Sequence, residues 1–163
     1  MKLRIGDIFT IPVTEEGTGF GQIVNIPNRN NFIICVFEKI YSGREWPSMS
    51  EIANDKILLL GYTMDAKIYR NDWKIIGNET STLPNINLPF FKLGTPPDYN
   101  LVDFKGMFLR KINKELFNKL DYLTVVAPIR YENALKAYHQ LTEWRKDFDN
   151  LLYSNIPKSV EEL

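Results

Sequence analysis

The sequence contains very few of the residues that most often build redox, metal or nucleophilic sites. Its 163 residues include a single cysteine, Cys35, and a single histidine, His139. One cysteine cannot form an internal disulfide, and the two residues together are too few for a zinc site of cysteines and histidines. The sequence therefore predicts a reduced protein with no metal site and no cofactor.

Long hydrophobic runs and an excess of one charge are also missing. No apolar run approaches the roughly 20 residues needed to span a bilayer, and the first six residues lack the apolar segment of a signal peptide. Twenty Lys and Arg residues are balanced by 20 Asp and Glu residues. This balance argues against a binder driven by charge toward nucleic acid or a membrane surface. We expect a cytoplasmic protein that does not associate with membranes, and whose oligomeric state the sequence leaves open.

Hydrophobic residues make up 44% of the chain and charged residues 25%, which is typical of a soluble domain with a core. We expect one domain over residues 1–163, whose first 77 residues form mainly strands. Residues 7–13 alternate between apolar and polar, residues 20–26 return after a turn, and residues 32–37 are almost all apolar. The third segment is predicted to be buried on both faces. Three strands joined by short turns predict an antiparallel meander.

Further along, Ser48 and Glu51 fit a capping box and predict a short helix near residues 49–54. Strand patterns resume at residues 57–62, around 68–69, and at 73–77. Residues 78–98 hold four prolines and predict a linker or a long covering loop.

The second half, residues 99–163, predicts mixed strands and helices. Residues 99–104 and 107–112 flank Lys105 and Gly106 as a hairpin would, Asn113 can cap a helix to Leu120, and residues 123–126 resemble a strand. Pro128 suits the first turn of a helix, which continues toward residue 155 or gives way to a second helix at Thr142. We therefore expect an α+β fold, with a strongly bent or barrel-like N-terminal antiparallel sheet and C-terminal helices packed on it.

Three features could suggest catalysis or phosphate binding. The glycines of residues 17–21 are followed by a strand rather than by the helix that a phosphate loop needs, which favours a hairpin turn. His139 has no nucleophile or carboxylate at a suggestive spacing, so we expect a partly exposed helix residue rather than the base of a hydrolase. Cys35 lies in the most apolar strand and is expected in the core. No catalytic residue is assigned.

Two other segments are candidate binding surfaces. Tyr41, Arg44 and Trp46 fall in one loop and are of the residue types enriched at interface hot spots, although Trp46 could equally fold back as a lid over the core. Asp98 and Tyr99 in the second long loop are weaker candidates. The basic stretch 105–119 could contact an acidic partner or nucleic acid, or be an ordinary surface; it contains Lys105, Arg110, Lys111, Lys114 and Lys119.

Several of these segments together resemble a known family. Residues 6–12 (GDIFTIP), residues 19–24 (GFGQIV) and residues 73–77 (WKIIG) are similar to the immunity protein 26 family of bacterial polymorphic toxin systems. The later Ala127-Pro128 and Glu143-Trp144 pairs also suit this family. The resemblance covers nearly the whole chain, and its motifs are structural glycines and aromatics rather than chemical groups.

The resemblance implies an immunity protein, a non-enzymatic antitoxin that neutralises a cognate toxin domain by stoichiometric protein–protein occlusion. The neutral charge then favours binding through shape and aromatic anchors over mimicry of nucleic acid. The alternative is a small-barrel module that binds nucleic acid or a peptide, with Phe9, Phe20 and Phe32 as stacking platforms.

Overall fold

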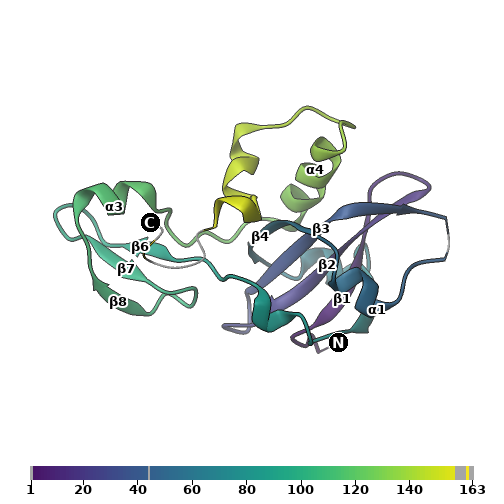
Figure 1. The fold of residues 1–163 in the computed structure, drawn as a ribbon, viewed down its shortest axis with the longest axis horizontal. Helices are drawn as coiled ribbons and strands as arrows, with labels where there is room; N and C mark the ends of the chain where they lie inside the picture. Colours follow the sequence, from purple (N-terminus) through teal and green to yellow (C-terminus); the bar gives the residue numbers. More distant parts are fainter. Residues whose placement is uncertain (1, 44, 157–160, 162–163) are drawn as a thin grey trace. The chain divides into compact units, whose positions relative to one another are not determined.

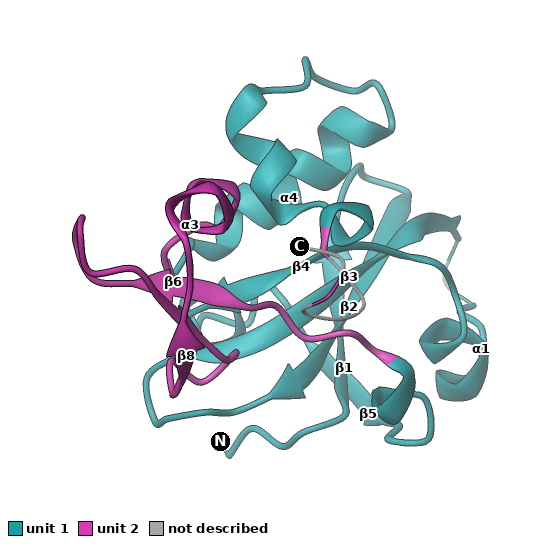
Figure 2. Cartoon of the chain, turned by 60° about the vertical axis from the view of Figure 1, so that its left-hand side comes forward, with its two compact units in different colours: residues 1–85, 125–155 teal, residues 86–124, 156–163 magenta. Residues whose placement is uncertain are grey.

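The computed structural model describes residues 2–43, 45–156 and 161 of the chain. The chain divides into two compact units (Figure 2). The large unit comprises residues 1–85 and 125–155, and the small unit comprises residues 86–124 and 156–163. The small unit is therefore inserted into the sequence of the large one.

The large unit is built around a five-stranded antiparallel sheet with the strand order β4-β3-β2-β1-β5 (Figure 1). The first four strands follow one another across the sheet, which confirms the predicted meander, and β5 joins the free edge of β1. The strands are β1 (Asp7–Pro12), β2 (Gly17–Asn25), β3 (Phe32–Ser42), β4 (Ile57–Thr63) and β5 (Ile75–Asn78).

The sheet is irregular but open. The register shifts where β1 meets β5, where β2 meets β3 and where β3 meets β4, and such bulges bend the strands that contain them. The edge strands β4 and β5 do not pair with each other, so the sheet is not closed into a barrel. The predicted α+β class is confirmed.

Strand β3 is buried on both faces, as its sequence predicts. Successive side chains point to opposite faces, yet Ile33, Ile34, Cys35 and Val36 are all fully buried. Helix α4 (Pro128–Tyr138) lies on one side of the sheet (Figure 1), contacts β3 and β4, and joins the core through Tyr131 and Leu135. The C-terminal part of the large unit thus packs on the sheet as expected.

The short helices between the strands agree only in part with the sequence. Helix α1 (Met49–Ala53) is capped by Ser48, whose side chain accepts a hydrogen bond from the Glu51 amide (3.2 Å), as predicted. The strand expected around residues 68–69 is wrong, because these residues belong to helix α2 (Ala66–Tyr69), a single turn that buries Ile68. A 3-10 helix, η1 (Leu83–Asn85), follows β5.

The chain re-enters the large unit along the edge of β4. Val126 donates its amide to the Tyr62 carbonyl (3.1 Å), and the Thr63 hydroxyl donates to the Val126 carbonyl (2.7 Å). The strand expected over residues 123–126 is reduced to a single bridge between Tyr62 and Val125. Pro128 then opens α4, as predicted.

The continuous helix to residue 155 is also wrong. Helix α4 ends at Tyr138, and Gln140 has a φ of 62°, a left-handed conformation that stops the helix. Two 3-10 helices follow, η2 (Lys146–Leu151) and η3 (Tyr153–Asn155). The chain turns back because Leu152 forms a bridge with Leu59 of β4.

The small unit holds a three-stranded antiparallel sheet in the order β6-β7-β8 and one helix. Its elements are β6 (Phe91–Leu93), β7 (Asn100–Val102), β8 (Phe108–Lys111) and α3 (Lys114–Lys119). The predicted hairpin and the Asn113 cap are confirmed, with the Asn113 side chain accepting from the Leu116 amide (2.8 Å). Strand β6 was not predicted, because it lies in the segment assigned to a long loop.

Candidate partner-binding site

An aromatic patch lies where the loop before α1 meets the sheet. We define it as Phe20 of β2, Tyr41 of β3 and Trp46. The rings of Tyr41 and Trp46 each contact Phe20 edge-on, with centroids 5.6 Å apart in both pairs. Phe20 is fully buried, whereas Trp46 is 40% exposed. Trp46 therefore covers part of the core and still presents a large apolar surface to solvent, which combines the two roles left open by the sequence.

Tyr41 is held in place by charged neighbours. Its hydroxyl donates to Asp55 Oδ2 (2.5 Å), and Lys39 Nζ lies 5.7 Å from its ring centroid. Burial and the Asp55 carboxylate raise the pKa of Tyr41 to about 12. The hydroxyl thus stays protonated near neutral pH and keeps this hydrogen bond.

The other candidate residues from the sequence fall elsewhere. Arg44 lies outside the described residues. Asp98 and Tyr99 belong to the small unit, where Asp98 pairs with Lys111 of β8 and Tyr99 packs on Phe117 with ring centroids 4.9 Å apart. The hydrogen bond from Lys111 holds the pKa of Asp98 below its usual range. The structure brings Tyr41 and Trp46 together in one unit and Asp98 and Tyr99 together in the other.

Sequence reasoning missed the cluster around Phe117. Lys92 Nζ lies 4.6 Å from the ring centroid of Phe117 and 4.9 Å from that of Tyr122, and the Tyr122 hydroxyl donates to the Gly94 carbonyl (2.8 Å). Cation–π contacts of this kind fix the lysine between the rings. Only the Phe-Lys-Leu alternation of β6 could have signalled it, and three residues are too few to predict a strand.

The sequence also missed a surface hollow of about 440 Å³ in the large unit, lined in part by Glu15 and Asp72. Its most buried charged group is Glu132 of α4, whose carboxylate accepts from the Trp73 indole (3.2 Å). Lys67 and Lys136 lie 3.8 and 3.6 Å from the same carboxylate. The two lysines are thus paired with a residue of this chain, and the arrangement fixes α4 against the segment that leads into β5.

The residues considered for catalysis have structural neighbours instead. The Nε2 atom of His139 lies 2.7 Å from the Glu38 carbonyl oxygen, which can only accept a hydrogen bond, so this nitrogen carries the proton. Cys35 is fully buried, and burial raises the pKa of its thiol to about 12. Trp73 lies in the core, stacked on Phe9 with ring centroids 5.0 Å apart.

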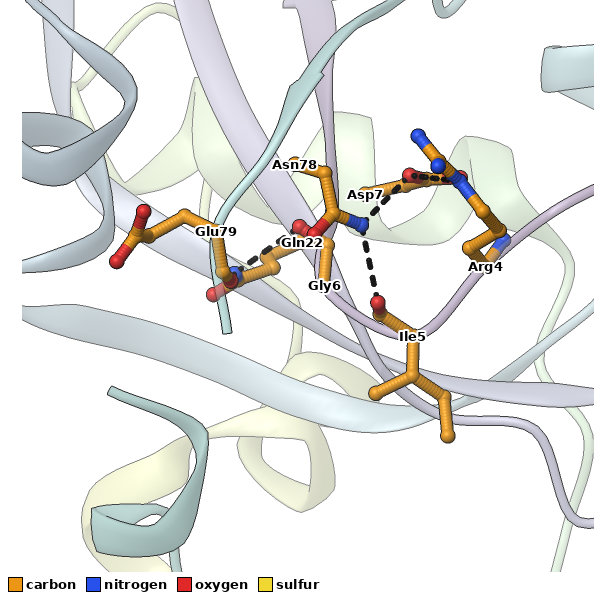
Figure 3. A network of polar contacts seen from close by, with 7 residues as sticks. All are labelled: Arg4, Ile5, Gly6, Asp7, Gln22, Asn78 and Glu79. Carbon is orange, nitrogen blue, oxygen red and sulfur yellow. Dashed lines mark hydrogen bonds and ion pairs between the residues drawn. The ribbon is translucent and has the colours of Figure 1, made fainter. Parts of the chain in front are cut away.

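The glycine and aspartate of the first motif form a polar clamp at the sheet end (Figure 3). Asp7 accepts from the Arg4 amide (2.8 Å) and the Asn78 side chain (2.9 Å). The Gln22 side-chain amide donates to the carbonyls of Gly6 (3.2 Å) and Glu79 (2.5 Å). The clamp therefore ties the N-terminal segment, β2 and the end of β5 together, and the motif acts through the fold.

The comparison with known families decides the identity of the chain. The model of the immunity protein 26 family matches residues 4–102. The chain belongs to this family. The family recognised in the sequence is thereby confirmed, and the match includes the whole five-stranded sheet and the aromatic patch. The match does not extend to the Ala127-Pro128 and Glu143-Trp144 pairs.

No curated protein and no solved structure matches the chain. Among the described residues of this immunity protein 26 family member, no helix has both the length and the hydropathy to cross a membrane. The same part of the chain contains no group of three or more His, Cys, Asp or Glu residues placed to hold a metal ion.

The structure removes the stacking surface on which the alternative function depended. Phe9 and Phe20 are fully buried and Phe32 is 3% exposed. A nucleic-acid base cannot stack on a ring that other side chains already cover. The expectation that these three residues form a binding face is wrong, because both sides of the sheet are packed.

Proposed function

We propose that this immunity protein 26 family member neutralises a cognate bacterial toxin domain by binding it in a stoichiometric complex. It would cover the toxin active site or an adjacent surface and would catalyse no reaction. The family match over residues 4–102 carries this proposal. A complex of standard size would bury about 1,600 Å².

The aromatic patch supports the choice of contact surface. Tyr and Trp are enriched among the residues that dominate binding energy, and their value rises when the ring is already ordered in the free protein. Trp46 meets this condition, because its edge-on contact with Phe20 holds it while 40% of its surface stays exposed. We propose Tyr41 and Trp46, with Arg44, as contacts, and Asp98 and Tyr99 as weaker ones.

The charge balance supports the mode of binding. With 20 basic and 20 acidic residues, the chain has no excess of negative charge with which to imitate a nucleic acid. Shape and aromatic anchors would therefore contribute more to affinity than long-range electrostatics. We also propose that the protein acts in the bacterial cytoplasm, where it would protect its own cell.

A rescue experiment tests the proposed function. The toxin encoded next to this chain is expressed in sensitive cells with the chain or with an unrelated soluble protein of similar size, and surviving cells are counted. We expect survival with the chain only, and a purified complex with a 1:1 mass. Death despite soluble expression of the chain, or protection at amounts far below the toxin, would contradict stoichiometric neutralisation.

A further inference from the structure

Strand β8 of the small unit and the residue before it expose an unusual run of apolar side chains. Met107, Phe108 and Leu109 are 63%, 58% and 45% exposed, respectively, and follow one another directly in the sequence. Stable monomers rarely leave three consecutive apolar residues in solvent unless the residues have a function. We define these three residues as the apolar run.

The apolar run also lies at a free strand edge. Strand β8 ends the order β6-β7-β8, so β7 is its partner on one side and its other side has no partner strand among the described residues. Within the β7–β8 pair, Val102 faces Phe108 and Leu101 faces Arg110, which leaves Leu109 as the extra residue of a bulge. An edge strand keeps a row of backbone donors and acceptors that another extended segment can pair with.

The sequence of this edge is basic, and the nearby carboxylates of Asp98 and Asp103 are already bonded within the small unit. Residues 105–114 contain four basic residues and no acidic one. Lys111 pairs with Asp98, and Lys105 Nζ lies 5.6 Å from the Phe104 ring centroid. Arg110 and Lys114 form no ion pair within the described part of the chain, so their charge remains free for a partner.

These features select the chemistry of the partner. Two copies of this chain paired through β8 would bring the unpaired Arg110 and Lys114 of both copies together and supply no free carboxylate for them, which is unfavourable. A single-stranded nucleic acid would use the positive charge and could stack one base on Phe108, but Met107 and Leu109 would gain no stacking contact. An extended protein segment with apolar residues beside carboxylates satisfies both the apolar run and the basic side chains.

We propose that the free edge of β8 docks an apolar, acidic extended segment of the toxin and determines which toxin the protein recognises. This inference rests on the proposed function. The family match ends at residue 102, before β8 begins, so the surface lies outside the part of the chain that the match shares with the family. Asp98 acts here as a positioning residue, since it holds Lys111 beside this edge.

The test measures binding of the full chain to an inactivated form of the cognate toxin. In one variant Phe108→Ser and Leu109→Ser are combined, and in a second Arg110→Glu reverses the free charge. We expect the first to weaken the affinity by about 30-fold or more, as for a hot spot, and the second by about 10-fold with a smaller salt dependence.

Matched control variants come from exposed positions of the large unit. Ile129→Ser combined with Leu141→Ser removes two apolar side chains that are 41% and 50% exposed, and Lys74→Glu reverses an exposed charge. Both controls should bind within about 3-fold of the wild type, the scale of an energetically neutral contact. Far-UV circular dichroism and thermal melting check folding, and Arg110→Glu keeps the test decisive if the double variant unfolds.

Failure of this inference can be told apart from failure of the proposed function. If the wild type neither binds nor rescues, the proposed function is wrong and the inference is overturned with it. If the wild type binds and both β8 variants bind equally well, only the docking surface is wrong.

A dimer seen by sedimentation and lost in the double variant, with toxin affinity unchanged, would assign β8 to a second copy. Salt-dependent binding of a single-stranded oligonucleotide, lost in Arg110→Glu with toxin affinity unchanged, would assign it to nucleic acid.

Discussion

At the residue scale, the glycines of β2 are required by the side chains that pack against them. A Cβ atom on Gly21 would lie 2.4 Å from Phe9 Cζ and 2.9 Å from the Cys35 carbonyl oxygen, and one on Gly19 would lie 2.5 Å from Leu135 Cδ2. Because Phe9 is fully buried and stacked on Trp73, its ring has no space into which it can move. The second family motif is therefore explained by close packing across the sheet.

We predict that Gly21→Ala destabilises the protein by about 1–3 kcal/mol, the usual cost of overpacking a filled core. The free energy of unfolding in urea measures it. Gly43→Ala is the control, since no atom lies within 4 Å of the added Cβ and the cost comes from its φ of 87° alone. Equal stability of wild type and Gly21→Ala would show that the Phe9 ring relaxes freely.

At the element scale, the C-terminal end of α4 is fixed to β3 through one glutamate. Glu38 accepts a hydrogen bond from the Tyr138 hydroxyl (2.7 Å) and lies 3.3 Å from Lys56 Nζ, while its carbonyl accepts from His139 (2.7 Å). The Tyr138 hydrogen bond, followed by Lys56 and by the nearby His139, lowers the pKa of Glu38 below 4.5. The helix end and the strand are thus joined by both side-chain and backbone groups.

This arrangement predicts a pH dependence with a defined sign. Because the pKa of Glu38 is lower in the folded state, its ionised form stabilises the fold above the unfolded-state pKa of 4.5. As the pH falls from the unfolded-state pKa through the lower folded-state pKa, Glu38 is protonated and its contribution to stability is lost. We expect Glu38→Gln to lose less stability than the wild type between about pH 5 and pH 3. Unfolding in urea at each pH measures this.

Glu143→Gln is the control for that experiment, because Glu143 is an exposed carboxylate of the same unit. Its pH profile should follow that of the wild type. Parallel profiles for the wild type and Glu38→Gln would show that the Tyr138 and Lys56 contacts do not act on the ionised carboxylate.

At the scale of the whole molecule, two tryptophans have similar settings and different predicted roles. Trp46 is 40% exposed and packs edge-on against buried Phe20 with centroids 5.6 Å apart. Trp144 is 37% exposed and packs edge-on against buried Phe148 at 5.3 Å. Their packing contributions to stability should therefore be similar. A difference in toxin affinity between the Trp46→Ala and Trp144→Ala variants then reflects direct contact with the toxin.

We predict that Trp46→Ala weakens toxin binding by about 30-fold or more, which corresponds to a hot spot of about 2 kcal/mol. Trp144→Ala should bind within about 3-fold of the wild type. Titration calorimetry with an inactivated toxin measures both. If the two variants lose affinity equally, the loss comes from general destabilisation, and Trp46 is not an interface anchor.

The division into two units was not visible in the sequence. The prolines and polar residues of 78–98 predict a loop, and this segment does contain the boundary at residue 85, but β6 lies within it as well. The alternation of Phe91, Lys92 and Leu93 acquires its meaning from pairing with β7, a contact between segments separated in the sequence. Neither binding candidate in the small unit could be placed before that pairing was known.

The sequence by itself determined the α+β class, the N-terminal meander, the Ser48 and Asn113 caps and the family, because each depends on local periodicity, side-chain capping or a contiguous motif. Only the tertiary structure decided where the C-terminal helix ends, since its residues keep a helical pattern but Leu152 is bridged to β4. It also decided that Phe9, Phe20 and Phe32 are buried while Trp46 and the apolar run of β8 are exposed. Exposure depends on which distant segments cover a side chain, and that information is absent from local sequence.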